Sequence, residues 1–381
     1  MSPRVDPLPR RLGVARYFDG TRLHPGDVEI TGNTVSRVGL PPGPDGLAAP
    51  GWIDLQVNGF AGVDVLHAGE AELRAMATRL AATGVTAALP TVITATCADT
   101  AAAVGAIDAV CRAPEPNASR FLGAHLEGPF LSSAFPGAHP TPLLRTSSTA
   151  LLELTALPGV AMTTLAPELF DDATITAAAA SCVVSIGHSD GTATRSREAF
   201  AAGAGALTHA FNAHRPIRSR DAGPLGAALT SPHAVLTVIA DGIHVATENL
   251  TVLHRAAPGR LALITDCTVA TGLPNGDYSF GDLSVTVADD RAMLSDGTLA
   301  GSVATLDHCV RVAAATWGLE VALAAASRIP AELLGRYDLG QLGAGSIADL
   351  VCLDDDLRVV ETIIDGNTAW ARHKEKLPAC R

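Results

Sequence analysis

The stretch RFLGAHLEG, residues 120–128, is an apolar run that ends in a histidine and a glutamate and then passes into Gly-Pro. Seven other stretches repeat this pattern of an apolar run with a polar end. Helical segments rich in Ala or Leu, such as 70–84 and 99–112, lie between most of them. Strands buried on both faces have this near-continuous apolar character, which is typical of a parallel sheet. The other stretches are residues 51–59, 84–92, 159–168, 182–190, 205–213, 234–244 and 260–268.

Eight strand–helix units predict an α/β protein built on a TIM-like (β/α)8 barrel, here residues 49–340. The two ends of the chain have a different pattern, with short candidate strands and Gly or Asn turns at 1–48 and again at 339–367. We therefore expect residues 1–48 and 341–381 to form one small discontinuous β domain, a β-sandwich. Asn-Gly and Asp-Gly turn signals within 274–302 predict a hairpin excursion near the barrel mouth.

Composition narrows the class of protein. Hydrophobic residues make up 48% of the 381 residues and charged ones 17%, so the chain can bury a large core. The net charge of −12 and the lack of a basic run argue against nucleic-acid binding. No apolar run is long enough to span a membrane, and the first residues lack the apolar core of a signal peptide.

The cysteines indicate a reducing compartment, the cytoplasm. There are seven, with no CxxC pair, and this odd, scattered set does not suit a disulfide framework. We interpret four of them as small buried hydrophobic residues: Cys97, Cys182, Cys267 and Cys309.

Ionisable residues collect at the ends of four predicted strands, namely Glu127, His188, His209 and Asp266. In a (β/α)8 barrel these carboxyl ends surround the active site. One Glu and two His suit zinc and leave a coordination position open for water, whose pKa a divalent metal can lower from 15.7 to about 7. Asp266 is then placed to take the proton of that water and to deliver it to a leaving amine.

A purely structural interpretation of these residues competes with the chemical one. A single histidine at the end of an apolar run is more often a hydrogen-bonded core residue, but four ionisable residues at four strand ends favour a site. For His125 both interpretations stay open, because its side chain shares a face with Glu127 and could support the ligands.

An arginine-rich loop at 212–223 follows the sixth predicted strand and holds Arg215, Arg218 and Arg220. A protein this acidic needs a local cluster of positive charge to bind an anionic substrate, and the planar guanidinium matches phosphate oxygens. A solvated loop is the alternative, which we favour for Arg215 and Arg218 but not for Arg220.

These motifs, in this order along residues ~12 to ~370, resemble the N-acetylglucosamine-6-phosphate deacetylases of the amidohydrolase superfamily. The resemblance implies that the barrel is of the amidohydrolase type and that the enzyme removes acetate from N-acetylglucosamine 6-phosphate. It also implies a homodimer. It rests on PGWIDLQVNG (50–59), GAHLEGPFL (123–131), SIGHSD (185–190), LTHAFNA (207–213), IADGIHV (239–245), LITD (263–266), GS (301–302) and GQLGAGSIADLV (340–351).

Carried over position by position, the resemblance implies a role for each site residue. The metal ligands would be Glu127, His188 and His209, with Asp266 as catalytic acid/base and His139 polarising the acetyl carbonyl. The implied substrate-binding residues are Asn212, Ala213, Arg220 and His244, together with His139.

Two departures from the family pattern affect these expectations. Many amidohydrolases carry His-x-His at the end of the first strand, where this chain has Gln56 and Asn58. Amides bind Zn²⁺ poorly compared with imidazole, so these two residues should not hold a second ion. We therefore expect one divalent metal ion per subunit, and we expect it to be zinc. The loops at 132–140 and 218–226 also differ from the sequence that is commoner in the family. This difference leaves a different N-acyl amino sugar or a cyclic amide as an alternative substrate. A third hypothesis is a non-catalytic barrel that serves as a binding subunit.

Overall fold

The computed structural model describes residues 8–281 and 283–372. Its centre is the predicted barrel, in which β7, β10 and β12 to β17 pair in parallel in this order. Asp266 donates its backbone N–H to the carbonyl of Gln56 at 3.0 Å, which joins the last strand to the first. The strands are β7 (Trp52–Val57), β10 (Val85–Ile93), β12 (Ala124–Glu127), β13 (Val160–Leu165), β14 (Val183–Ile186), β15 (Ala206–Leu207), β16 (Val235–Ile239) and β17 (Leu261–Ile264), with β11 (Arg120–Phe121) beside β10.

Every residue of β7 and β10 is buried, as expected for strands covered on both faces. Helices surround the sheet, and several begin at a Ser, Thr or Asp whose side chain accepts a backbone N–H, as Thr96 does from Asp99. The helices are α1 (Glu70–Leu80), α2 (Cys97–Arg112), α3 (Ser148–Thr155), α4 (Asp172–Ala179), α5 (Ala193–Ala201), α6 (Gly223–Thr230), α7 (Thr247–Ala256), α8 (Leu306–Trp317), α9 (Leu319–Ala326) and α10 (Arg328–Leu333), with 3-10 turns at Ala81–Thr83, Thr141–Leu143 and Pro167–Leu169.

The described residues of the stretch 274–302 contain an antiparallel four-stranded sheet where the sequence predicts a hairpin excursion. It consists of β18 (Gly276–Phe280), β19 (Leu283–Ala288), β20 (Arg291–Met293) and β21 (Leu299–Ser302). The last strand returns to the barrel, because Ser302 donates its backbone N–H to the carbonyl of Asp266 at 2.8 Å. A short hairpin of β8 (Gly59–Phe60) and β9 (Val63–Asp64) follows the first barrel strand.

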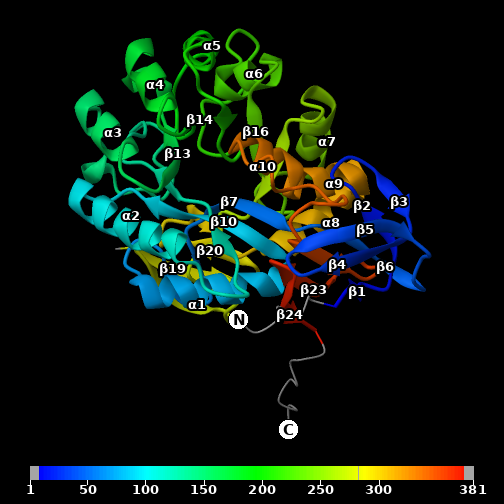
Figure 1. The fold of residues 1–381 in the computed structure, drawn as a ribbon. Coiled ribbons are helices and arrows are strands. Elements are labelled where there is room, and N and C mark those ends of the chain that lie inside the picture. Colours follow the sequence, from blue (N-terminus) through cyan, green and yellow to red (C-terminus); the bar gives the residue numbers. More distant parts are fainter. Residues whose placement is uncertain (1–7, 282, 373–381) are drawn as a thin grey trace.

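The two ends of the chain share a six-stranded sheet, in the order β24-β23-β22-β6-β2-β3. Figure 1 shows the blue N-terminal strands beside the red C-terminal ones. Its members are β2 (Val14–Phe18), β3 (Leu23–Pro25), β6 (Asp45–Pro50), β22 (Leu350–Leu353), β23 (Val359–Ile364) and β24 (Asn367–Ala371). A three-stranded sheet of β1 (Arg10–Arg11), β4 (Asp27–Thr31) and β5 (Thr34–Leu40) accompanies it.

A buried carboxylate, Asp27, fastens this chain-end region. Its Oδ1 accepts the backbone N–H groups of Gly13, Val14 and Val28 at 2.8–3.0 Å, and its Oδ2 accepts from Arg11 at 3.0 Å. Because the two ends of the chain pair in one sheet, we propose that they form the small β domain with the predicted limits, 1–48 and 341–381. Of these, residues 1–7 and 373–381 lie outside the described residues. Within the described chain, no helix is long and apolar enough to cross a membrane.

Candidate active site

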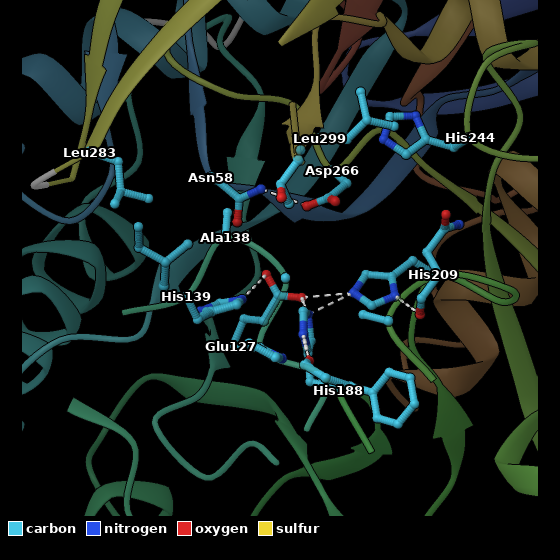
Figure 2. Close-up of a pocket in the computed structure, with 18 of the residues that line it drawn as sticks. Asn58, Glu127, Ala138, His139, His188, His209, His244, Asp266, Leu283 and Leu299 are labelled. Carbon is cyan, nitrogen blue, oxygen red and sulfur yellow. Dashed lines mark hydrogen bonds and ion pairs between the residues drawn. The ribbon is translucent and has the colours of Figure 1, made fainter. Parts of the chain in front are cut away.

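Four barrel strands end at one cavity and supply four of its ionisable side chains (Figure 2). Glu127 is the last residue of β12, and His188, His209 and Asp266 each lie two residues beyond β14, β15 and β17. The backbone φ angles of the latter three are 46°, 31° and 52°, in the left-handed region that residues other than glycine rarely adopt. Such strain persists where the surrounding structure enforces it and is concentrated at functional sites.

Glu127, His188 and His209 form a compact triangle. The Oε1 atom of Glu127 lies 3.3 Å from His188 Nε2 and 3.1 Å from His209 Nε2, and the two nitrogens are 3.1 Å apart. Ligand atoms that bind one zinc ion at about 2.0–2.2 Å in tetrahedral geometry are separated by roughly 3.4 Å. The three predicted ligands therefore fit a single divalent metal.

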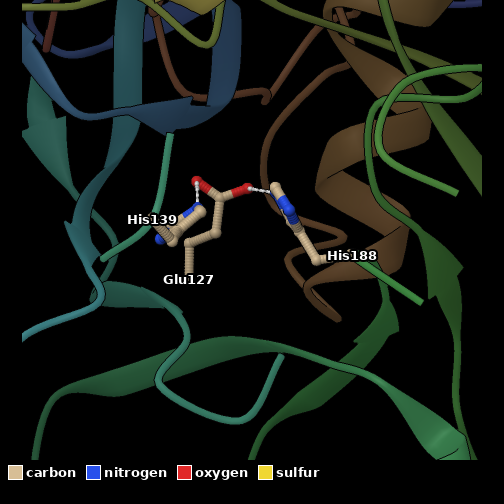
Figure 3. Close-up of side chains that lie close together, drawn as sticks. All are labelled: Glu127, His139 and His188. Carbon is tan, nitrogen blue, oxygen red and sulfur yellow. Dashed lines mark ion pairs between the residues drawn. The ribbon is translucent and has the colours of Figure 1, made fainter. Parts of the chain in front are cut away.

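A second set of three residues also meets the spacing of a metal site, because His139 lies close to Glu127 and His188 (Figure 3). His139 Nε2 is 3.8 Å from Glu127 Oε2, the other oxygen of the carboxylate. Glu127 and His188 belong to both sets, so the third ligand is either His139 or His209.

The hydrogen bonds at Nδ1 distinguish His209, which can bind a metal through Nε2, from His139, which cannot. His188 Nδ1 donates to the carbonyl of Phe135 at 2.9 Å, and His209 Nδ1 donates to that of Asn212 at 3.1 Å. Because a carbonyl only accepts, each Nε2 keeps a lone pair for a metal. His139 is the opposite case, since its Nδ1 accepts the backbone N–H of Thr94 at 3.3 Å and its Nε2 carries the proton. His139 thus offers a donor to the cavity, whereas His209 offers a ligand.

The electrostatics of the site divide the two carboxylates. Burial opposes the charge of Glu127, but the close contacts of His188 and His209 with its carboxylate outweigh it and hold its pKa well below the usual value. Burial raises the pKa of Asp266 to about 7, and the negative charge of Glu127 adds to the rise. Burial also lowers the pKa of His139 to about 3, so its imidazole stays neutral at pH 7. One carboxylate is therefore ionised and the other is suited to exchange a proton near neutral pH.

Two amides at the end of the first strand contact both carboxylates. Gln56 Nε2 donates to Glu127 Oε1 at 2.8 Å and to Asp266 Oδ1 at 2.9 Å. Asn58 Nδ2 donates to the same Asp266 oxygen at 2.7 Å. Both donors fall on Oδ1, and no group among the described residues donates to Oδ2. Oδ2 is therefore the oxygen of Asp266 that is free to carry a proton.

The cavity has a volume of about 580 Å³ and joins the predicted residues to others that sequence reasoning missed. The predicted residues that line it are Glu127, His139, His188, His209, Asn212, Ala213, His244 and Asp266, along with Asn58. The missed ones come from β10, the loop before His139, β16 and the sheet of β18–β21 with its turns, where no motif of ionisable residues marks them: Ile93, Ala134, Phe135, Pro136, Gly137, Ala138, Ile239, Phe280, Leu283, Asp296, Thr298, Leu299 and Gly301.

The structure does not bring Arg220 to this cavity. Its side chain is exposed and is not among the described residues that line the cavity wall. Arg215 forms ion pairs with Asp190 and Asp221 at 3.0 and 3.2 Å and so stabilises its own loop, and Arg218 is exposed. Within a single chain, the predicted arginines of this loop therefore stay outside the cavity.

His244 does reach the cavity, and a neighbouring carboxylate orients it. Its Nδ1 lies 2.6 Å from Asp241 Oδ2, so Nδ1 carries the proton and Nε2 is left for other contacts. Burial opposes the charge of Asp241, but its hydrogen bond with His244 outweighs this and lowers the pKa of Asp241.

Burial and hydrogen bonding decide the role of His125, which the sequence leaves open, and correct the prediction for Cys97. His125 is a core residue, fully buried, with one ring nitrogen bonded to the carbonyl of Leu55 at 2.9 Å and the other to Thr164 Oγ1 at 2.8 Å. The prediction that Cys97 is buried is wrong, because it is the first residue of α2 and its side chain faces solvent. Cys267 and Cys309 are buried as expected, and Cys182 is partly buried.

Comparisons with known proteins identify the family of the chain. Residues 47–369 match the amidohydrolase family. The chain is 38% identical over 347 residues to the N-acetylglucosamine-6-phosphate deacetylase of Danio rerio, covering 86% of this chain and 85% of that protein. It is 37% identical over 332 residues to the N-acetylgalactosamine-6-phosphate deacetylase of Shewanella sp. strain ANA-3, covering 85% and 84%.

A solved structure of similar fold contains a bound sugar. It is a variant of the N-acetyl-D-glucosamine-6-phosphate deacetylase of Mycobacterium smegmatis in complex with N-acetyl-D-glucosamine-6-phosphate. Its TM-score to this chain is 0.89 with 32% sequence identity, covering 95% of this chain and 99% of that one. The chain therefore belongs to the amidohydrolase family and, within it, to the N-acetylglucosamine-6-phosphate deacetylases.

Proposed function

We propose that the protein hydrolyses the acetamide of N-acetylglucosamine 6-phosphate to glucosamine 6-phosphate and acetate. The observation that carries this proposal is the meeting, in one cavity, of the triangle of Glu127, His188 and His209 with the buried carboxylate of Asp266. The activities named for the relatives supply the substrate.

One divalent metal ion per subunit, zinc by our inference, would be held by Glu127, His188 and His209. A bound ion of this kind supplies a Lewis acid and lowers the pKa of water to about 7. Gln56 and Asn58 support a count of one, because both turn N–H groups toward the carboxylates and amide oxygens bind Zn²⁺ poorly compared with imidazole.

Asp266 is the general acid and base in this proposal. Its free Oδ2 takes one proton from the attacking water as the oxygen bonds to the acetyl carbon. The same oxygen then gives the proton to the nitrogen, the C–N bond breaks, and acetate and the amine are released. The neutral His139 donates its Nε2–H to the carbonyl oxygen, where negative charge develops.

The phosphosugar would be bound by Asn212, Ala213 and His244 at the cavity wall and by Arg220 from the exposed loop. Because Arg220 does not line the cavity of its own chain, we propose that it binds phosphate within a homodimer. The six described cysteines are free, which supports a cytoplasmic enzyme.

The test is acetate release from N-acetylglucosamine with and without the 6-phosphate. We expect a much higher kcat/KM for the phosphorylated sugar, and Arg220→Ala and His244→Ala should raise KM for that sugar alone. Arg218→Ala, on the same loop and also exposed, is the matched control and should change neither substrate.

Other outcomes would select an alternative. Equal kcat/KM with and without phosphate would favour a different N-acyl amino sugar or a cyclic amide. The relative from Shewanella makes N-acetylgalactosamine 6-phosphate the second substrate to assay. No hydrolysis of any of these amides by metal-loaded protein would favour a binding subunit.

A further inference from the structure

Asn58, which lines the cavity, has an unpartnered side-chain oxygen. Among the described residues, eight buried side-chain polar atoms have no hydrogen-bond partner. Of these, Asn58 Oδ1 is the one whose residue lines the cavity. Its residue is only 2% exposed, so solvent cannot replace the missing partner freely. A buried polar atom without a partner is costly, and at a binding site it indicates that a ligand supplies the partner.

The orientation of this amide is fixed by its surroundings. Asn58 Nδ2 donates to Asp266 Oδ1 at 2.7 Å, and the reverse orientation would place two oxygens against each other. The backbone is held as well, because the N–H of Asn58 donates to Cys267 at 2.9 Å and its carbonyl accepts from Val65 at 3.1 Å. Figure 2 shows the nitrogen turned toward Asp266 and the oxygen turned away from it.

The partner that suits this oxygen in the proposed reaction is a hydrogen-bond donor, because an amide oxygen accepts hydrogen bonds and binds Zn²⁺ poorly compared with imidazole. In the proposed reaction, a secondary acetamide brings a single donor to the scissile bond, its N–H. Its carbonyl oxygen faces the donor on His139, and its nitrogen receives the proton of Asp266. Asn58 lines the same cavity and is bonded to Asp266 through Nδ2, so its free oxygen belongs to a side chain that adjoins the group protonating this nitrogen.

We propose that Asn58 Oδ1 accepts the N–H of the scissile acetamide and selects amides over esters; this inference rests on the proposed function. The same side chain orients Asp266 through its Nδ2. As the nitrogen loses conjugation with the carbonyl, its N–H stays on Asn58 and its lone pair turns to the proton on Asp266 Oδ2. The nitrogen takes that proton, the C–N bond breaks, and its electron pair remains on the nitrogen.

The experiment compares two substrates that differ at the N–H. They are N-acetylglucosamine 6-phosphate and the corresponding 2-O-acetyl ester of glucose 6-phosphate, assayed by acetate release. In Asn58→Leu and Asn58→Ala, the ratio of kcat/KM for amide to that for ester should fall about tenfold or more, because a site that binds a substrate N–H discriminates against analogues that lack it. Comparison of this ratio between each variant and wild type cancels the different intrinsic reactivity of the two bonds.

Gln56→Leu is the matched control. It removes donors from Asp266 and Glu127 but leaves the free oxygen of Asn58 in place, so it should slow both substrates in equal proportion. Metal content and melting temperature of each variant show that the barrel and its ion are retained.

The outcomes separate this inference from the function on which it rests. An equal loss on amide and ester in both Asn58 variants would assign Asn58 to the orientation of Asp266 alone and overturn the inference. Wild-type protein that releases no acetate from the amide would instead contradict the proposed function itself.

Discussion

The barrel mouth and the chain-end sheets each bury an aspartate, and the two are bonded differently. Asp27, in the chain-end sheets, uses both oxygens, with three backbone N–H groups on one and Arg11 on the other. Asp266, at the mouth, receives Gln56 and Asn58 on a single oxygen. A carboxylate that holds a fold together is saturated with donors, whereas one that exchanges a proton keeps an oxygen free.

The largest effect should follow from removing the free oxygen at the mouth. Asp266→Asn should lower kcat about a thousandfold, because an amide cannot take a proton from water. The variant should still bind about one metal ion per chain by elemental analysis, since the ligand triangle is intact. His188→Ala is the control that should lose both metal and activity. Near wild-type turnover by the Asp266→Asn variant would refute the acid/base role.

An intermediate effect, on stability and not on catalysis, is expected at the saturated carboxylate. Asp27→Ala should lower the free energy of unfolding by about 4 kcal/mol, because it leaves several buried N–H groups and Arg11 without their acceptor. Urea denaturation measures this loss, and kcat of the folded protein should not change. Asp27→Asn keeps one acceptor oxygen and should cost less. Equal losses of unfolding free energy in the two variants would show that the acceptor oxygen kept by Asp27→Asn contributes nothing to stability.

The smallest effect concerns Asp54 on β7, the strand between the two regions. Its oxygens accept from Thr265 Oγ1 at 2.6 Å and from the backbone N–H groups of Thr265 and Gln56 at 3.2 Å. Burial nevertheless raises its pKa from 3.8 to about 6. Between these values the unfolded chain is ionised while the folded protein keeps the proton. Stability therefore falls as pH rises from about 4 to 6 and changes no further above that window.

Asp54→Asn removes this titration. The free energy of unfolding of the variant, relative to wild type, should rise by about 2 kcal/mol between pH 4 and pH 7. Denaturation of both proteins at the two pH values tests this. A constant difference between them would mean that Asp54 titrates alike in both states.

Much of the barrel and its site can be predicted from the sequence, because the hydrophobic pattern indicates which strands are buried and in which order they follow. The eight apolar runs are the eight barrel strands, and the four ionisable residues at their ends meet in one cavity. The amides at Gln56 and Asn58 are recognisable in the sequence as poor metal ligands beside the site. Their contacts with Asp266 cannot be foreseen, because they depend on side-chain orientation.

Other features are out of reach for physical reasons. The left-handed backbone at His188, His209 and Asp266 is imposed by the folded barrel, since local propensity opposes it. The opposite tautomers of His139 and His209 depend on carbonyl and N–H groups that only the fold brings near them. The position of Arg220 outside the cavity depends on the path of its loop, which no periodicity describes.

The pairing of β6 with β22 also governs how the polypeptide can assemble. Leu47 lies opposite Leu353, so these partners are separated by about 300 residues of chain. During synthesis, β2, β3 and β6 must wait with an open strand edge until the last strands leave the ribosome, and contacts this distant form late and slowly. A chain that stops before β22 would keep that edge exposed to other chains. The six-stranded sheet therefore distinguishes finished chains from truncated ones.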